Sequence, residues 1–197
     1  MVVTERVPGI VRWTLQLEQA TALDRPVRAL ERPVASLFGT GARGSALRGE
    51  WLGHALHPIL TDLAIGTWTS ASVLDMVGGA EASPSSRTLI GVGLIAAAPT
   101  AWTGWAEWSA IPFRDKKVGL VHALTNGLAI ALYARSWAAR GRGRHGAGVR
   151  LALAGAAVSG LGAYLGGHLA LARRVPSHHP AYDDQVPAEQ PSGSFSV

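Results

Sequence analysis

Four apolar segments follow one another along the chain, and they constrain its fold more than any other feature. They lie roughly at residues 57–77, 88–108, 118–138 and 149–172. A helix of about 20 apolar residues crosses a hydrocarbon layer about 30 Å thick. Because the connections are short, neighbouring helices should run antiparallel. The pattern predicts an all-α fold, a four-transmembrane-helix up-down bundle over residues 51–175.

A soluble helical bundle is the main alternative, because Asp62 and Asp75 lie within the first segment. Helices on the surface of a soluble protein carry a charged face on every turn, and these segments lack one. Residues 89–104 and 120–133 contain no Asp, Glu, Lys or Arg. Charged residues make up only 16% of the chain, whereas apolar residues make up 48%. These observations favour a membrane domain.

Residues 1–50 are expected to form an amphipathic N-terminal helical arm and a linker. Apolar residues recur at steps of three and four over residues 13–37, which indicates a helix with one apolar face. Pro26 and Pro33 should divide it into two short helices that lie along the bilayer surface. A turn rich in glycine and arginine is expected at 39–48. The tail at 176–197 is expected to be disordered.

Three histidines fall near the same end of three different segments. His57 opens the first segment, His122 lies near the start of the third, and His168 lies near the end of the fourth. In an up-down order these imidazoles meet in one layer at one membrane face, with His54 as a fourth or outer group. Imidazole is the commonest transition-metal ligand, and two histidines on facing helices suit an axially ligated haem. We therefore expect a transition metal ion or haem b.

Other polar residues share this layer. Asn126 lies four positions after His122, and Tyr164 lies four positions before His168, so each pair shares a helix face and is a candidate for cofactor binding. Asp62 and Glu107 are candidates to hydrogen-bond the ligating imidazoles. No catalytic residue is expected. The alternative is that the histidines bind no cofactor and only staple helix ends or relay protons.

The absence of cysteine excludes disulfides, thiolate zinc sites and cysteine-held iron–sulfur clusters. The net charge is +5, but the basic residues flank the apolar segments rather than forming a stripe with interleaved aromatic residues. The expected partner is therefore the lipid bilayer and not nucleic acid. Basic residues are nearly balanced between the two sides. The lack of signal-peptide features favours a multi-pass protein of the plasma membrane with cytoplasmic termini.

Closely spaced Trp, Gly and His residues carry a family resemblance at 22–26, 51–69, 73–79, 100–108, 119–126 and 164–169. Together these stretches resemble the DUF2231 family of predicted four-helix membrane proteins, over about residues 20–172. The family usually has aspartate where Glu107 stands, so a carboxylate is kept. Some similar chains continue into a Rieske iron–sulfur domain. This sequence ends at Val197 without cysteine, so the resemblance implies a separate Rieske-type or other redox partner.

The leading interpretation is a metal- or haem-binding membrane protein that transfers electrons with a separate redox protein. The rival is a non-catalytic scaffold or assembly protein whose histidines only hydrogen-bond helix ends. A carrier of small solutes or protons is a weaker third interpretation, because the sequence shows no broken-helix pair or repeated half of the kind typical of transporters. A homodimer stays open, since four thin helices rich in alanine and glycine enclose little space for a macrocycle.

Overall fold

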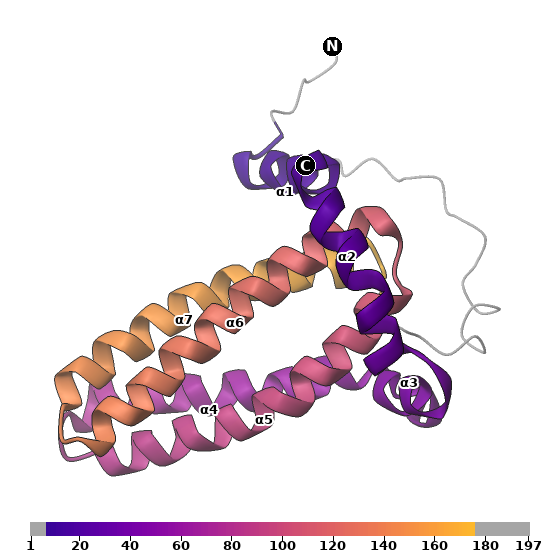
Figure 1. The fold of residues 1–197 in the computed structure, drawn as a ribbon. Helices are drawn as coiled ribbons and strands as arrows, with labels where there is room; N and C mark the ends of the chain where they lie inside the picture. The colour runs from indigo at the N-terminus through magenta and orange to yellow at the C-terminus, as the bar shows by residue number, and fades with distance from the viewer. Residues whose placement is uncertain (1–6, 176–197) are drawn as a thin grey trace, which may run out of the picture.

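The computed structural model describes residues 7–175, and throughout that range the architecture is all-α. Four long helices lie side by side with alternating direction, as Figure 1 shows: α4 (Leu56–Gly78), α5 (Ser83–Ala110), α6 (Phe113–Gly141) and α7 (His145–Gly167), which continues as the π-helical turn η4 (His168–Ala172). Three spans are long and apolar enough to cross a membrane, namely α5, α6 and the continuous α7–η4 helix. The all-α fold is confirmed. A fourth span, α4, stays a prediction, because this helix carries Asp62, Asp75 and several hydroxyl groups.

The helix bounds follow from local signals. Pro58 and Pro84 lie in the first turns of α4 and α5, where a missing N–H costs no hydrogen bond. Gly79 follows α4 with a φ of 53°, a conformation that glycine adopts without strain. Helix α6 begins five residues before the predicted segment. Its first turn carries Lys116 and Lys117, which are buried beneath the N-terminal arm and paired there.

The N-terminal arm is more helical than expected. It consists of α1 (Gly9–Gln19), η1 (Thr21–Leu23), α2 (Asp24–Val34), η2 (Ala35–Gly39), α3 (Gly41–Arg48) and η3 (Glu50–Leu52). The break lies at residues 20–23 rather than at a proline, because Pro26 falls in the first turn of α2, where proline is tolerated. The prediction of a turn at 39–48 is wrong. Most of it is α3, which ends at Gly49 with a φ of 76°.

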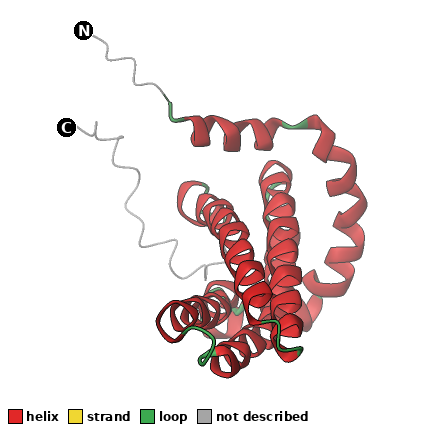
Figure 2. Cartoon of the chain, turned by 90° about the vertical axis from the view of Figure 1, so that its left-hand side faces the viewer, coloured by secondary structure: helices red, strands yellow, loops and turns green. Residues whose placement is uncertain are grey.

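The arm packs across one end of the bundle, and Figures 1 and 2 show it projecting beyond the four long helices. Its apolar residues Val27 and Val34 are buried against Trp108 of α5 and Leu120 of α6. This apolar face of α2 is therefore covered by the bundle, in contrast with the expectation that the arm lies along the bilayer. The difference arises because charged side chains of α6 pair with the polar face of the same arm.

The bundle consists of two repeated hairpins, α4–α5 and α6–α7. Trp68 of α4 packs on Gly93 of α5, and in the second hairpin Tyr133 of α6 packs on Gly155 of α7. Trp68 and Tyr133 occupy equivalent positions, 65 residues apart, and their rings stack on each other with centroids 4.1 Å apart. This internal repeat was not predicted from the sequence.

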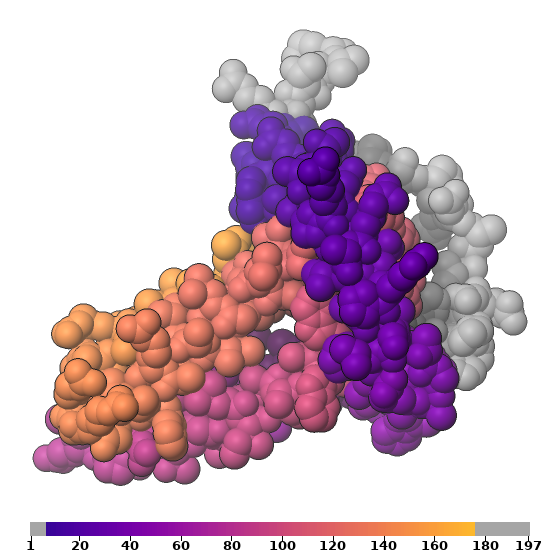
Figure 3. All heavy atoms as spheres, viewed as in Figure 1, coloured from indigo at the N-terminus to yellow at the C-terminus, as the bar shows by residue number. Residues whose placement is uncertain are grey.

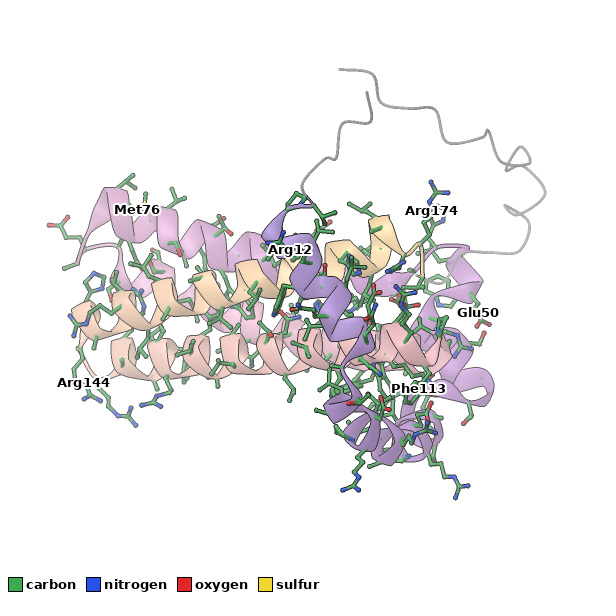
Figure 4. All side chains as sticks on the ribbon, turned by 90° about the horizontal axis from the view of Figure 1, so that it is seen from above. Arg12, Glu50, Met76, Phe113, Arg144 and Arg174 are labelled. Carbon is green, nitrogen blue, oxygen red and sulfur yellow. The ribbon has the colours of Figure 1, made fainter. Side chains whose placement is uncertain are left out.

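Equivalent residues of α4 and α6 also meet at both ends of the bundle. At the far end, beside Met76 and Arg144 in Figure 4, Arg140 forms a two-pronged ion pair with Asp75, again 65 positions away. The Arg140 side chain is fully buried and that of Asp75 is 4% exposed. Contacts between equivalent residues at several levels place an approximate two-fold axis between α4 and α6. Any ligand on this axis is shared by the two halves.

Candidate functional site

The candidate site is the pair of imidazoles at the arm end of this axis. The ring centroids of His57 on α4 and His122 on α6 lie 6.1 Å apart, and the ring planes are crossed at 78°. The two residues are equivalent positions of the repeat, 65 residues apart. The two hairpins therefore supply one imidazole each, so the pair forms only when both halves are packed together.

Each imidazole is fixed by a hydrogen bond to the second helix of its own hairpin. Nδ1 of His57 lies 2.9 Å from the carbonyl oxygen of Thr100, and Nδ1 of His122 lies 2.8 Å from that of Gly162. A carbonyl oxygen can only accept, so Nδ1 carries the proton in both rings. The lone pair of each neutral ring is therefore on Nε2, the nitrogen left for a ligand.

Two glycines make room for the rings. A Cβ atom on Gly104 would lie 2.8 Å from Cε1 of His57, and a Cβ atom on Gly166 would lie 2.9 Å from Cε1 of His122. Each glycine stands four positions after the carbonyl that its histidine binds. Both imidazoles are held by the same arrangement. On α5 and on α7 alike, it consists of a backbone carbonyl and a glycine one turn apart. These four backbone positions had not been predicted as part of the site.

Two other predicted residues contact the pair. The side-chain nitrogen of Asn126 lies 3.1 Å from Nε2 and 3.4 Å from Nδ1 of His122, so the amide lies over the face of this imidazole. The backbone N–H of His57 donates to the carboxyl group of Glu107. The other oxygen of that group, Oε1, is buried without a hydrogen-bond partner. Glu107 thus secures the start of α4, where His57 stands.

His168 does not join the pair. Its Nε2 lies 2.8 Å from Oε1 of Glu18, a side chain of α1 that is fully buried. Arg114 and Arg173 also donate to the same carboxylate. Burial alone would raise the pKa of Glu18, but the hydrogen bonds from Arg173, His168 and Arg114 together outweigh it and lower that pKa from 4.5 to about 2. His168 therefore serves the docking of the arm.

Three predicted residues remain, and none of them is fully buried. His54 is exposed in the turn before α4, Asp62 is exposed on the outer face of α4, and Tyr164 is half-buried on α7. Within residues 7–175, no three His, Asp or Glu side chains come together in an arrangement that could hold a metal ion. The imidazoles that meet between the two hairpins are thus two, and the three-histidine layer expected from the sequence is divided between two places.

The fold and this pair define an all-helical membrane protein with a histidine pair between its repeated halves. The family model described as "Predicted membrane protein (DUF2231)" matches residues 53–178, which is more than half of the chain. The chain therefore belongs to the DUF2231 family. No curated protein and no solved structure matches it.

Proposed function

We propose that this protein is a membrane haem protein in which His57 and His122 would hold one haem b. The observation that carries the proposal is the crossed imidazole pair with both Nδ1 protons given to backbone carbonyls. A hydrogen bond at Nδ1 fixes the tautomer and makes Nε2 a better ligand. Two neutral imidazoles from facing helices match the ligand set of a six-coordinate haem.

The separation of the rings supports the same ligand set. Two imidazoles can hold one metal ion only if their rings lie close together. The centroids of His57 and His122 are 6.1 Å apart. A bare zinc or copper site needs three or four protein ligands, and the described residues offer no third one here. Haem therefore fits the donor set better than a metal ion alone.

The residues around the pair have distinct tasks in this proposal. Bound haem would supply one-electron chemistry. Thr100 and Gly162 orient the rings, and Gly104 and Gly166 keep them close to α5 and α7. Asn126 lies over the face of the His122 ring and would help to orient it. A separate redox protein, of Rieske type or another kind, is the proposed electron partner at the same membrane face.

The test is the absorption spectrum and haem content of the full chain purified from haem-supplied cells. The expected result is a Soret band with one haem per chain or per dimer, lost in both His57→Ala and His122→Ala. His168→Ala is the matched control, because its imidazole binds Glu18, and it should keep the haem. A protein without haem or stoichiometric metal would favour the scaffold function, in which the two imidazoles only join helices.

The cellular placement proposed with this function is the plasma membrane with both termini in the cytoplasm, which puts the histidine pair near the cytoplasmic face. Cysteine is absent from the chain, so single cysteines can be introduced at each end of the bundle and labelled from one side. Labelling of the arm end by an impermeant reagent in intact cells would show that the protein has the opposite orientation. Haem content and mass measured on the same sample decide between a monomer and a homodimer.

A further inference from the structure

A second candidate site lies in the seam between α4 and α7, away from the imidazole pair. The seam contains a cavity of about 230 Å³. Its walls include Trp68 and Thr69 of α4, Tyr133 of α6, and Ala156, Ser159 and Gly160 of α7. Trp68 and Tyr133 each stand 11 positions after their histidine, so the cavity lies about 16 Å along the bundle from the pair, at a rise of about 1.5 Å per residue. That depth is within the membrane-spanning part.

The internal repeat shows that this cavity is a specific feature of one seam. The positions of α5 equivalent to those of α7 lie 62 residues earlier. Leu94 is thus the counterpart of Ala156, and Leu94 packs against the apolar core. The counterparts of Ser159 and Gly160 are Ala97 and Ala98. Compared with α5, helix α7 therefore has smaller side chains at Ala156 and Gly160 and an added hydroxyl group at Ser159. The space results from residues that differ between the halves.

The chemistry of the walls suggests the kind of occupant. The Oγ atom of Ser159 is buried and has no hydrogen-bond partner among the described residues. A hydroxyl group without a partner is costly in hydrocarbon, so an acceptor in the cavity would stabilise it. Trp68 and Tyr133, whose rings stack on each other, form the aromatic part of the wall. None of the side chains that line the cavity is charged. A lipid headgroup with its phosphate is therefore a poor match.

We propose that this seam binds the ring of an isoprenoid quinone. A quinone combines a flat ring, carbonyl oxygens that accept hydrogen bonds, and an apolar tail that extends into the acyl chains. Its ring would lie against the Trp68–Tyr133 stack, and one carbonyl would accept from Ser159. Apolar walls with one or two placed polar groups are typical of small-molecule sites. The proposal concerns binding only, and it does not depend on haem at the histidine pair.

Photolabelling of the full chain in lipid nanodiscs with an azido-benzoquinone that carries a decyl tail tests the proposal. The expected result is saturable labelling of the α4–α7 seam, found by peptide mapping and prevented by excess unlabelled decyl quinone. Ala156→Leu introduces the leucine that α5 has at the equivalent position, Leu94. This larger side chain fills the cavity and should lower the labelling at least tenfold. Ser159→Ala removes one hydrogen bond and should weaken competition by unlabelled quinone about three- to tenfold.

Ala157→Leu is the matched control, because Ala157 is an exposed neighbour outside the cavity and its counterpart Ile95 is 78% exposed. It should label like the unmodified chain. Equal labelling of all variants would overturn the proposal. Equal competition by decanol, which has the tail without the ring, would instead make the seam a slot for acyl chains and would also overturn it. Since labelling needs no electron transfer, its result is separate from that of the haem test.

Discussion

Replacing Glu18 by glutamine tests how the arm is held to the bundle. The Glu18 carboxylate is fully buried and accepts hydrogen bonds from His168, Arg114 and Arg173. Its pKa is lowered from 4.5 to about 2 by these partners, which outweigh the opposing effect of burial. One pKa unit corresponds to about 1.4 kcal/mol, so the charged form contributes about 3 kcal/mol to docking. The glutamine variant should lose most of this contribution.

The sign of the pH dependence follows from the direction of the shift. Because the folded pKa of Glu18 is below its ordinary value of 4.5, the stabilisation is complete above pH 4.5. It should then be lost as the pH falls from about 4.5 to about 2. The arm of the unmodified chain should therefore separate from α6 and α7 in this acidic window, while the apolar contacts of α2 weaken only as a consequence.

Spin labels at two introduced cysteines, Gln16→Cys on α1 and Leu171→Cys on η4, report the separation directly. Both side chains are exposed, and the chain has no cysteine of its own. Glu18→Gln should broaden and lengthen the distance distribution at neutral pH. Glu50→Gln is the matched control, because Glu50 is 47% exposed and its partners Arg48 and Ser45 are close to it in the chain. Identical distances in the Glu18→Gln variant and the unmodified chain would refute the reasoning.

Three further substitutions have defined expectations. Asp75→Asn leaves the fully buried Arg140 without its charge partner and should destabilise the bundle by about 3–5 kcal/mol, measured by unfolding in detergent. Gly104→Ala should push His57 from its place and lower haem content, whereas the Gly66→Ala control has open space around its Cβ and should not. Gly93→Ala brings a Cβ into Trp68 and should lower the melting temperature, at a cost of about 1–3 kcal/mol.

The long helices were predictable from the sequence because their length and apolar content are local properties of the chain. The meeting of His57 and His122 was also predictable, since an up-down order brings the starts of the first and third segments to one end. The position of His168, away from this pair and in contact with Glu18, was not predictable. Its partner Glu18 lies 150 positions earlier, in an arm whose docking depends on tertiary ion pairs that no periodicity reveals.

The internal repeat was missed although a sequence signal exists. Both α4 and α6 contain a histidine, five residues, Leu-Ala-Ile, two residues and an aromatic ring, beginning at His57 and at His122. A likeness of five positions among many alanines and glycines is weak by itself. The structure identifies this likeness as a repeat, because equivalent residues of the two helices contact each other. The cavity beside Ser159 follows from differences between the halves and becomes visible only after they are aligned.

Electron paramagnetic resonance of the oxidised, haem-loaded protein is the most direct test of the histidine pair. Two neutral imidazoles that would both hold the iron give a low-spin ferric signal, and crossed ring planes make that signal highly anisotropic. With the planes of His57 and His122 at 78°, this account predicts such a signal in the unmodified chain and its replacement by a high-spin signal or by loss of haem in either alanine variant. An unchanged low-spin signal in His57→Ala or His122→Ala would contradict the account, as would a chain that binds no haem.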